Sequence, residues 1–175
     1  MSTSEELHEH AEHAAHSNEP FNKRVAATMA IIAAVLAVVG VLGQVSVTEE
    51  LLLQQKASDQ WAYYQAKSIR RYESEVARDL FGALKQSDSS QTYQKNADRY
   101  RDDQAEIQKK AGELEAESRT SGRRAQRYHF GEVFIEIAIV LASLAILAHR
   151  EAIYWLAVLS AALGSAIALS VLLVH

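Results

Sequence analysis

The sequence predicts an all-α membrane protein with three transmembrane helices and an antiparallel coiled-coil helical hairpin inserted between the first and the second. Two apolar runs without any charge, Val25–Gly43 and Ala152–Val174, indicate the membrane helices, because about 20 apolar residues in a helix cross a bilayer core. A third run, Val133–Ala148, is shorter and contains one carboxylate, Glu136. The segment Thr48–Tyr128 is densely charged and keeps a helical periodicity, which indicates the hairpin.

These patterns divide the 175 residues into five segments. A soluble bundle of buried helices is the alternative, but a bundle helix keeps a polar stripe for water, and Ala152–Val174 has none. The expected segments are a polar His/Glu-rich tail over 1–20, membrane helices over 21–47, 129–148 and 152–174, and the hairpin over 48–128 with arms at about 49–84 and 91–127.

The polar run Lys85–Gln91 is expected to be the turn of the hairpin, because Ser and Asp compete for backbone hydrogen bonds. After it, residues recur at steps of four and three, the period of a coiled-coil seam. That seam reads Tyr93, Ala97, Tyr100, Gln104, Ile107, Ala111, Leu114, Ser118, Ser121, Ala125 and Tyr128. The matching seam expected in the first arm reads Leu52, Gln55, Asp59, Ala62, Ala66, Ile69, Glu73, Val76, Leu80 and Ala83.

Folding these arms together would place Ala62 beside Ala111 and Val76 beside Ala97, with facing residue numbers adding to about 173. A two-helix hairpin buries little surface for its length, so apolar side chains remain for a partner. Self-association is the simplest partner, and an unknown protein stays open. The expected interaction surface comprises Trp61, Tyr64, Ile69, Val76, Tyr100, Ile107 and Leu114.

Four stretches of the sequence resemble a known family. They are EHAEHAAH at Glu9–His16, the residues Thr48–Glu50, DQWAYYQAKSIR at Asp59–Arg70, and GEVFIEIAIVLASLAIL at Gly131–Leu147. Together they resemble the bacterial membrane proteins grouped as domain-of-unknown-function family 4337, over nearly the whole chain. The resemblance implies a bacterial membrane location and the same order of one membrane helix, a helical insert and two further membrane helices. It implies no activity.

The N-terminal histidines are the one candidate metal site. His10, His13 and His16 follow one another at three-residue steps, which place neighbours on one face of a helix. Imidazole is a good ligand for Zn, Cu or Ni. No thiol or carboxylate completes an obvious site, and termini fray. A solvated tail is therefore the preferred interpretation, and no metal or other cofactor is expected.

Glu132 and Glu136 lie one helical turn apart at the start of the second membrane helix. A carboxylate at membrane depth is costly and by default suggests a function. In an oligomer the two could form a ring that attracts cations at the entrance of a pore. The alternative is structural pairing, with Arg127 or His129 neutralising Glu132.

Small residues in the membrane helices indicate close helix packing, which in lipid depends on dispersion contacts. Two rows have the required spacing: Ala26, Ala30, Ala33, Ala37, Gly40 and Gln44, and Ser160, Gly164 and Ala168.

Other chemistry finds little support. The aromatic and basic run from Trp61 to Arg70 could stack bases, but 48–128 carries fifteen Lys or Arg against fourteen Asp or Glu, so no nucleic-acid partner is expected. There is no cysteine, phosphate loop, nucleophile elbow or H-E-x-x-H motif, so we expect no enzyme.

The expected protein is a non-enzymatic, oligomeric scaffold or interaction protein in the bacterial inner membrane, and an ion channel or transporter is the rival. Lys23 and Arg24 precede the first span and Glu49 and Glu50 follow it, which favours a cytoplasmic N-terminus and a periplasmic hairpin. Arg119, Arg123, Arg124 and Arg127 on the hairpin side oppose this orientation.

Overall fold

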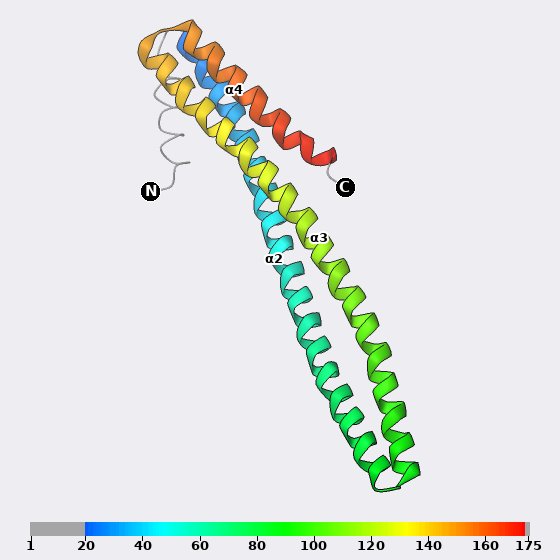
Figure 1. Cartoon of the computed structure of the whole chain (residues 1–175). Coiled ribbons are helices and arrows are strands. Elements are labelled where there is room, and N and C mark those ends of the chain that lie inside the picture. The colour runs from blue at the N-terminus through cyan, green and yellow to red at the C-terminus, as the bar shows by residue number, and fades with distance from the viewer. Residues whose placement is uncertain (1–19, 174–175) are drawn as a thin grey trace. The chain divides into compact units, whose positions relative to one another are not determined.

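The computed structural model describes residues 20–173, and every regular element in this range is a helix (Figure 1). Helix α2 (Pro20–Ala83) has 64 residues and helix α3 (Ser87–Ala148) has 62. Helix α4 (Glu151–Leu169) continues into a short 3₁₀ helix, η1 (Ser170–Leu173). The expected all-α class is confirmed. Helices α2 and α3 run without a break through residues 47 and 128, where the apolar stretches give way to the charged segment.

The two turns between the α-helices have the same construction. At the end of α2, the Gln86 amide donates to the Phe81 carbonyl at 2.9 Å, and Lys85 has a left-handed φ of 59°. At the end of α3, the Arg150 amide donates to the Ala145 carbonyl at 3.3 Å, and His149 has a φ of 48°. This pairing of a six-residue hydrogen-bonded loop with a left-handed residue is a Schellman-type helix end. The first turn is shorter than the expected Lys85–Gln91, since Ser87 already begins α3.

The chain forms two compact units. Unit 1 contains residues 20–47 and 121–173 of the described range, and unit 2 contains Thr48–Thr120. Each of the three α-helices includes a stretch long and apolar enough to cross a membrane, with mean hydropathy 2.7, 2.3 and 2.3 in chain order. These stretches match the three apolar runs of the sequence.

Unit 1 packs one face of each helix into a shared apolar core. Its buried side chains include Val25 and Ile32 from α2, Ile135 and Ile139 from α3, and Ala157 from α4. The outward faces are apolar as well, with large exposed side chains on every helix: Ile31, Val38, Val140, Leu147, Leu159 and Leu163. A helix in water keeps a polar outer face. The surface of unit 1 is therefore suited to an apolar surrounding.

Small residues bring α3 and α4 into close contact. A Cβ added at Gly164 would lie 2.6 Å from the Gly131 carbonyl oxygen, and one added at Gly131 would lie 2.8 Å from the Gly164 carbonyl oxygen. The Ser160 hydroxyl donates to the Phe134 carbonyl at 2.7 Å, and Ala168 packs against Gly131. The expected small-residue row of α4 therefore forms a helix contact. The expected row of α2 is divided: Ala26, Ala33 and Gly40 are buried or half-buried, whereas Ala30, Ala37 and Gln44 are exposed.

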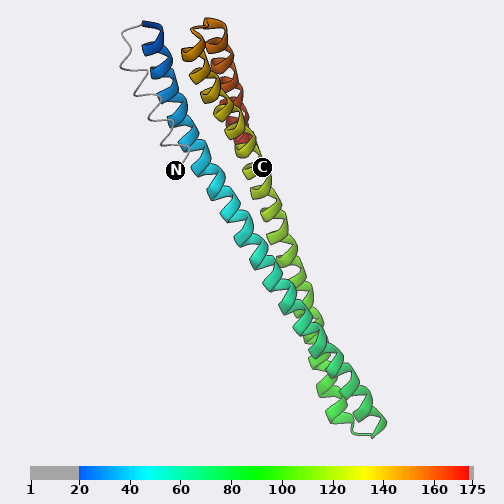
Figure 2. The same ribbon diagram turned by 90° about the vertical axis from the view of Figure 1, so that its left-hand side faces the viewer.

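In unit 2 the α2 and α3 segments lie side by side (Figure 2). Their cross-helix contacts join Lys67 to Asp103, Arg78 to Gln94 and Phe81 to Tyr93, pairs whose residue numbers add to 170, 172 and 174. These sums are close to the expected 173. All of the expected seam positions of α3 from Tyr93 to Ser118 are buried or half-buried.

The seam expected on α2 is wrong. All ten of its positions, Leu52 to Ala83, are exposed, including Ile69 at 59% and Val76 at 68%. The side chains that face α3 lie two residues away in the sequence, at the same steps of three and four. They are Glu50, Leu53, Ala57, Gln60, Tyr64, Lys67, Arg71, Ser74, Arg78 and Phe81, all buried or half-buried.

The glycine contact of unit 1 can be tested with a matched pair of alanine substitutions. We expect Gly164→Ala to lower the free energy of unfolding by about 1–3 kcal/mol, because the new methyl group meets backbone that cannot move aside. Gly112→Ala in α3 meets nothing within 4 Å, so it should stabilise the helix by about 0.5–1 kcal/mol. Thermal unfolding in detergent measures both. Equal effects of the two substitutions would contradict the close packing of α3 on α4.

Candidate interaction surface

The face of α2 that contacts α3 in unit 2 is largely polar. Lys67 shows how a charged side chain is held in this contact. Its Nζ donates to Asp103 Oδ2 at 2.7 Å and lies 5.3 Å from the ring centroids of Tyr63 and Tyr100. The hydrogen bond to Asp103, followed by that to Tyr63, raises the pKa of Lys67 above its usual 10.5. The aliphatic stem can pack between the helices while the charged group stays paired.

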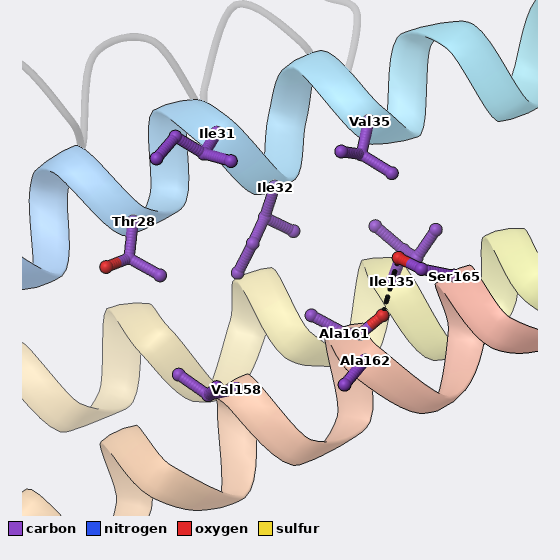
Figure 3. Close-up of a pocket in the computed structure, with 9 residues that line it drawn as sticks. All are labelled: Thr28, Ile31, Ile32, Val35, Ile135, Val158, Ala161, Ala162 and Ser165. Carbon is purple, nitrogen blue, oxygen red and sulfur yellow. Dashed lines mark hydrogen bonds between the residues drawn. The ribbon is translucent and has the colours of Figure 1, made fainter.

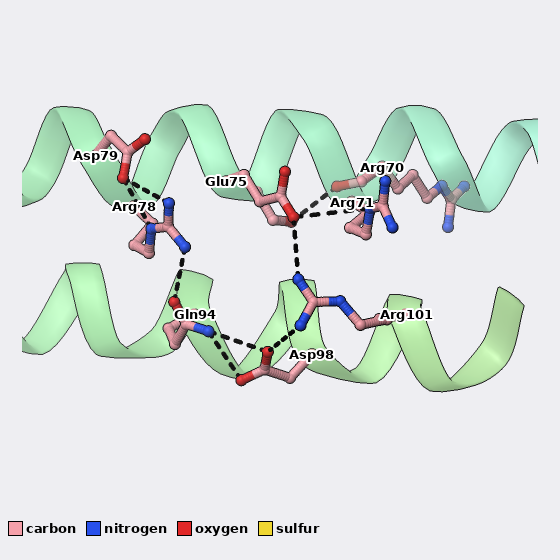
Figure 4. A network of polar contacts seen from close by, with 9 residues as sticks. Arg70, Arg71, Glu75, Arg78, Asp79, Gln94, Asp98 and Arg101 are labelled. Carbon is pink, nitrogen blue, oxygen red and sulfur yellow. Dashed lines mark hydrogen bonds and ion pairs between the residues drawn. The ribbon is translucent and has the colours of Figure 1, made fainter. Parts of the chain in front are cut away.

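A chain of charged groups continues this contact toward the turn (Figure 4). Arg78 donates to Gln94 Oε1 at 2.9 Å, and Gln94 donates to both carboxylate oxygens of Asp98 at about 3 Å. Arg101 approaches Asp98 at 3.9 Å on its own helix and Glu75 of α2 at 3.6 Å. Such partly exposed pairs add little stability individually. Their geometry specifies which residues of the two helices face each other.

Aromatic and hydroxyl groups make the remaining cross-helix contacts of unit 2. The Phe81 and Tyr93 rings stack at 5.4 Å with an angle of 7°. The Trp61 indole donates to Glu115 Oε1 at 2.8 Å, and the Ser118 hydroxyl donates to the Glu50 carbonyl at 3.1 Å. These contacts lie at both ends of the paired segments, so the same register holds along their length.

The apolar side chains that the sequence assigned to the contact with α3 form an exposed row instead. We call Leu52, Ala62, Ala66, Ile69, Val76 and Leu80 the outer α2 stripe; all six are exposed. The exposed side chains of α3 in unit 2 include no large hydrophobic residue. The outer face of α2 therefore carries the apolar surface of unit 2.

The predicted interaction residues separate into two groups. Trp61, Tyr64, Tyr100, Ile107 and Leu114 are buried or half-buried in unit 2. Ile69 and Val76 belong to the outer α2 stripe and contribute nothing to the contact with α3. The sequence missed Lys67, Arg71 and Arg78 as contact residues, because charged side chains are typical of a solvated face.

The two carboxylates of α3 in unit 1 have different surroundings. Glu132 is half-buried; its Oε2 lies 3.3 Å from His129 Nδ1, and its Oε1 lies near Gly40 of α2. This is the structural pairing with His129 that the sequence suggested. Glu136 is exposed among the apolar side chains Val133, Ile137 and Val140, and it forms no hydrogen bond or ion pair with any residue of 20–173.

Unit 1 also has an apolar groove of about 230 Å³ between its helices (Figure 3). Ile31, Ile32 and Val35 of α2 line one side, and Val158 and Ala162 of α4 line the other. Its two hydroxyl groups have partners: Thr28 bonds to Arg24 and Tyr154, and Ser165 bonds to the Ala161 carbonyl. The groove therefore offers apolar contact and no convergent polar groups for a hydrophilic solute.

No group of His, Asp or Glu within residues 20–173 has the arrangement of a metal site. The candidate ligands His10, His13 and His16 lie outside the described residues.

The family comparison covers nearly all of the described residues. The model of a family described as "Domain of unknown function (DUF4337)" matches residues 21–174. The chain belongs to this family. No curated protein and no solved structure matches the chain. Family membership assigns no function to the chain.

The raised pKa of Lys67 gives a pH prediction. Because the folded-state pKa lies above the unfolded value, the stabilisation by the Lys67–Asp103 pair is complete below about pH 10.5 and is lost as the pH rises through the folded-state pKa. We expect Lys67→Met to remove this alkaline loss of stability, measured by circular dichroism during thermal unfolding at about pH 9 to 12.

The control is Lys109→Met, whose own pair with Glu113 is largely exposed. It should leave the alkaline loss unchanged. The same pH dependence in wild type and Lys67→Met would show that Lys67 contributes nothing to it.

Proposed function

We propose that this chain is a non-enzymatic, oligomeric scaffold of the bacterial inner membrane, which acts through an antiparallel coiled-coil hairpin formed by unit 2. The outer α2 stripe is the observation that carries the proposal. A row of apolar side chains at coiled-coil spacing, left exposed by the contact of α2 with α3, is suited to bind another helix.

Membrane insertion is supported by unit 1. Three long apolar stretches, together with large apolar side chains on outward faces, favour lipid as the surrounding. Trp155 is exposed near the start of α4, where an aromatic residue suits the membrane interface. Three spans would put the turns at Lys85 and His149 on opposite sides of the bilayer.

The cross-helix contacts support an antiparallel hairpin. As the residue numbers rise along α2 from Glu50 to Phe81, those of the contacting residues on α3 fall from Ser118 to Tyr93. The orientation rests on charge: Lys23 and Arg24 before the first span favour a cytoplasmic N-terminus, and hence a periplasmic hairpin.

Cysteine labelling tests the topology. Asp88 and Arg150 are both exposed and lie at the two turns. We expect Asp88→Cys to react with a membrane-impermeant maleimide from the periplasmic side, and Arg150→Cys to react only after the membrane is opened. The chain has no native cysteine to interfere. Labelling of both positions from one side would contradict the three-span arrangement.

Glu136→Gln separates the scaffold from the channel. The exposure of Glu136 on an apolar face supports a neighbour outside the chain, which either a scaffold or a pore could supply. In a scaffold, the substitution removes a costly charge but no ion-conducting group. The reconstituted Glu136→Gln variant should therefore show the same negligible cation flux as wild type in a liposome assay. Flux in the wild-type protein that disappears in Glu136→Gln would favour the channel. Gln65→Glu in unit 2 is the control, because it changes charge outside the spans.

A further inference from the structure

The outer α2 stripe is built for a helix of a particular kind. Ten exposed positions from Leu52 to Ala83 alternate at steps of three and four, so they form one continuous line along α2. Between Ala62 and Leu80 the small apolar residues of that line precede the large ones. Ala62 and Ala66 come before Ile69, and Val76 and Leu80 come two to three turns after Ile69.

This order makes the stripe complementary to a reversed copy of itself. If two stripes run antiparallel about a point near residue 71, Ala62 meets Leu80 of the other copy and Ala66 meets Val76. At these positions small residues face large ones on both sides of the axis, which favours close packing. Next to the axis, Ile69 of each copy faces Glu73 of the other. The same contact occurs twice, as in any two-fold dimer.

Charge favours the same arrangement. Glu73 is the only charged residue of the line between Ala62 and Ala83, and Arg70 lies beside the line. Neither side chain forms an ion pair within residues 20–173. In the antiparallel pair, Glu73 of each copy lies next to Arg70 of the other. In a parallel pair, Glu73 would face Glu73 and Asp59 would face Asp59, which repel.

We propose that the outer α2 stripe binds the same stripe of a second copy of this chain, antiparallel about a two-fold axis near position 71. This inference rests on the proposed function, and it names the partner, the face and the register. It also carries a consequence for membranes. Because α2 is continuous from its apolar stretch into unit 2, the antiparallel contact can form between copies held in two separate bilayers.

Helix geometry fixes the span of such a link. From Thr48, where unit 2 begins, to position 71 there are 23 residues of continuous α2. At 1.5 Å per residue this distance is about 35 Å, so the two Thr48 residues would lie about 70 Å apart along the pair. The turn at Lys85 lies only 14 residues beyond the axis, about 21 Å, so the end of each hairpin stops short of the other copy's Thr48.

Disulfide trapping tests the register. Two differently tagged preparations, one with Ala66→Cys and one with Val76→Cys, are reconstituted in separate liposomes and then mixed and oxidised. The proposal predicts a mixed-tag crosslink between them at least several-fold stronger than crosslinks between identical variants. In the antiparallel pair two Val76 positions lie about 15 Å apart along the axis, too far for a disulfide. Stronger crosslinks of identical positions would mean a parallel pair and would overturn the proposal.

A charge exchange tests the same contact without cysteine at the seam. Clustering of proteoliposomes, followed by light scattering, should fall severalfold in Arg70→Glu and in Glu73→Arg, because each leaves like charges adjacent across the axis. The double variant should restore clustering, since the exchanged charges pair again. A parallel pair predicts no restoration, because the arginine introduced at position 73 would then face the same arginine of the other copy.

Glu106→Arg is the matched control, because this residue is exposed on the outer face of α3; it should cluster as wild type does. Wild-type clustering in both single variants would overturn the self-contact. The labelling pattern of Asp88→Cys and Arg150→Cys reports membrane topology independently of clustering. If the Glu106→Arg control loses clustering as the two single variants do, while the topology stays intact, this inference is rejected and the proposed function is not.

Discussion

The pairing of α2 with α3 depends on one shared period. An alternation of three- and four-residue steps runs along α2 from Asn22 to Phe81 through side chains that are all buried or half-buried. In α3 the same alternation runs from Tyr93 to Tyr128. A repeat of 3.5 residues keeps one line of side chains directed at a neighbouring helix over many turns. The cross-helix contacts of unit 2 and the core of unit 1 both use this line, although their chemistry is opposite.

The chemistry of the line explains what the sequence could predict. In α3 most inward positions are alanines, tyrosines, Ile107 and Leu114, with Gln104, Ser118 and Ser121 among them, so the apolar pattern and the true contact largely coincide. In α2 the inward positions include Lys67, Arg71 and Arg78, whose charged groups are paired at the edges of the contact. A pattern of hydrophobic residues carries no information on the pairing of charged side chains between helices. It therefore favours Ile69, Val76 and Leu80, which lie on the opposite side of the helix and are exposed.

For unit 1 the sequence predicted the apolar segments better than the contacts between their side chains. The apolar segments and the Ser160–Gly164–Ala168 row follow from residue types and spacing. The partner of that row, Gly131, sits beside charged residues and carries no spacing signal of its own. Likewise, Glu132 is half-buried against α2, whereas Glu136 one turn later is exposed. This difference depends on the rotation of α3 about its own axis, which is set by packing among the three helices.

Helix α2 turns a polar line toward α3 and leaves its apolar line outside. Disulfide formation within a single chain measures this directly, with Ser74 and Val76 each paired with Ala97 as double cysteine variants. Ser74 and Ala97 are both buried in unit 2, whereas Val76 is exposed. We expect rapid intramolecular crosslinking of the Ser74–Ala97 variant and little in the Val76–Ala97 variant, because the Val76 side chain points away from α3. Efficient crosslinking of Val76 with Ala97, and not of Ser74, would contradict the register of α2 and the existence of the outer stripe.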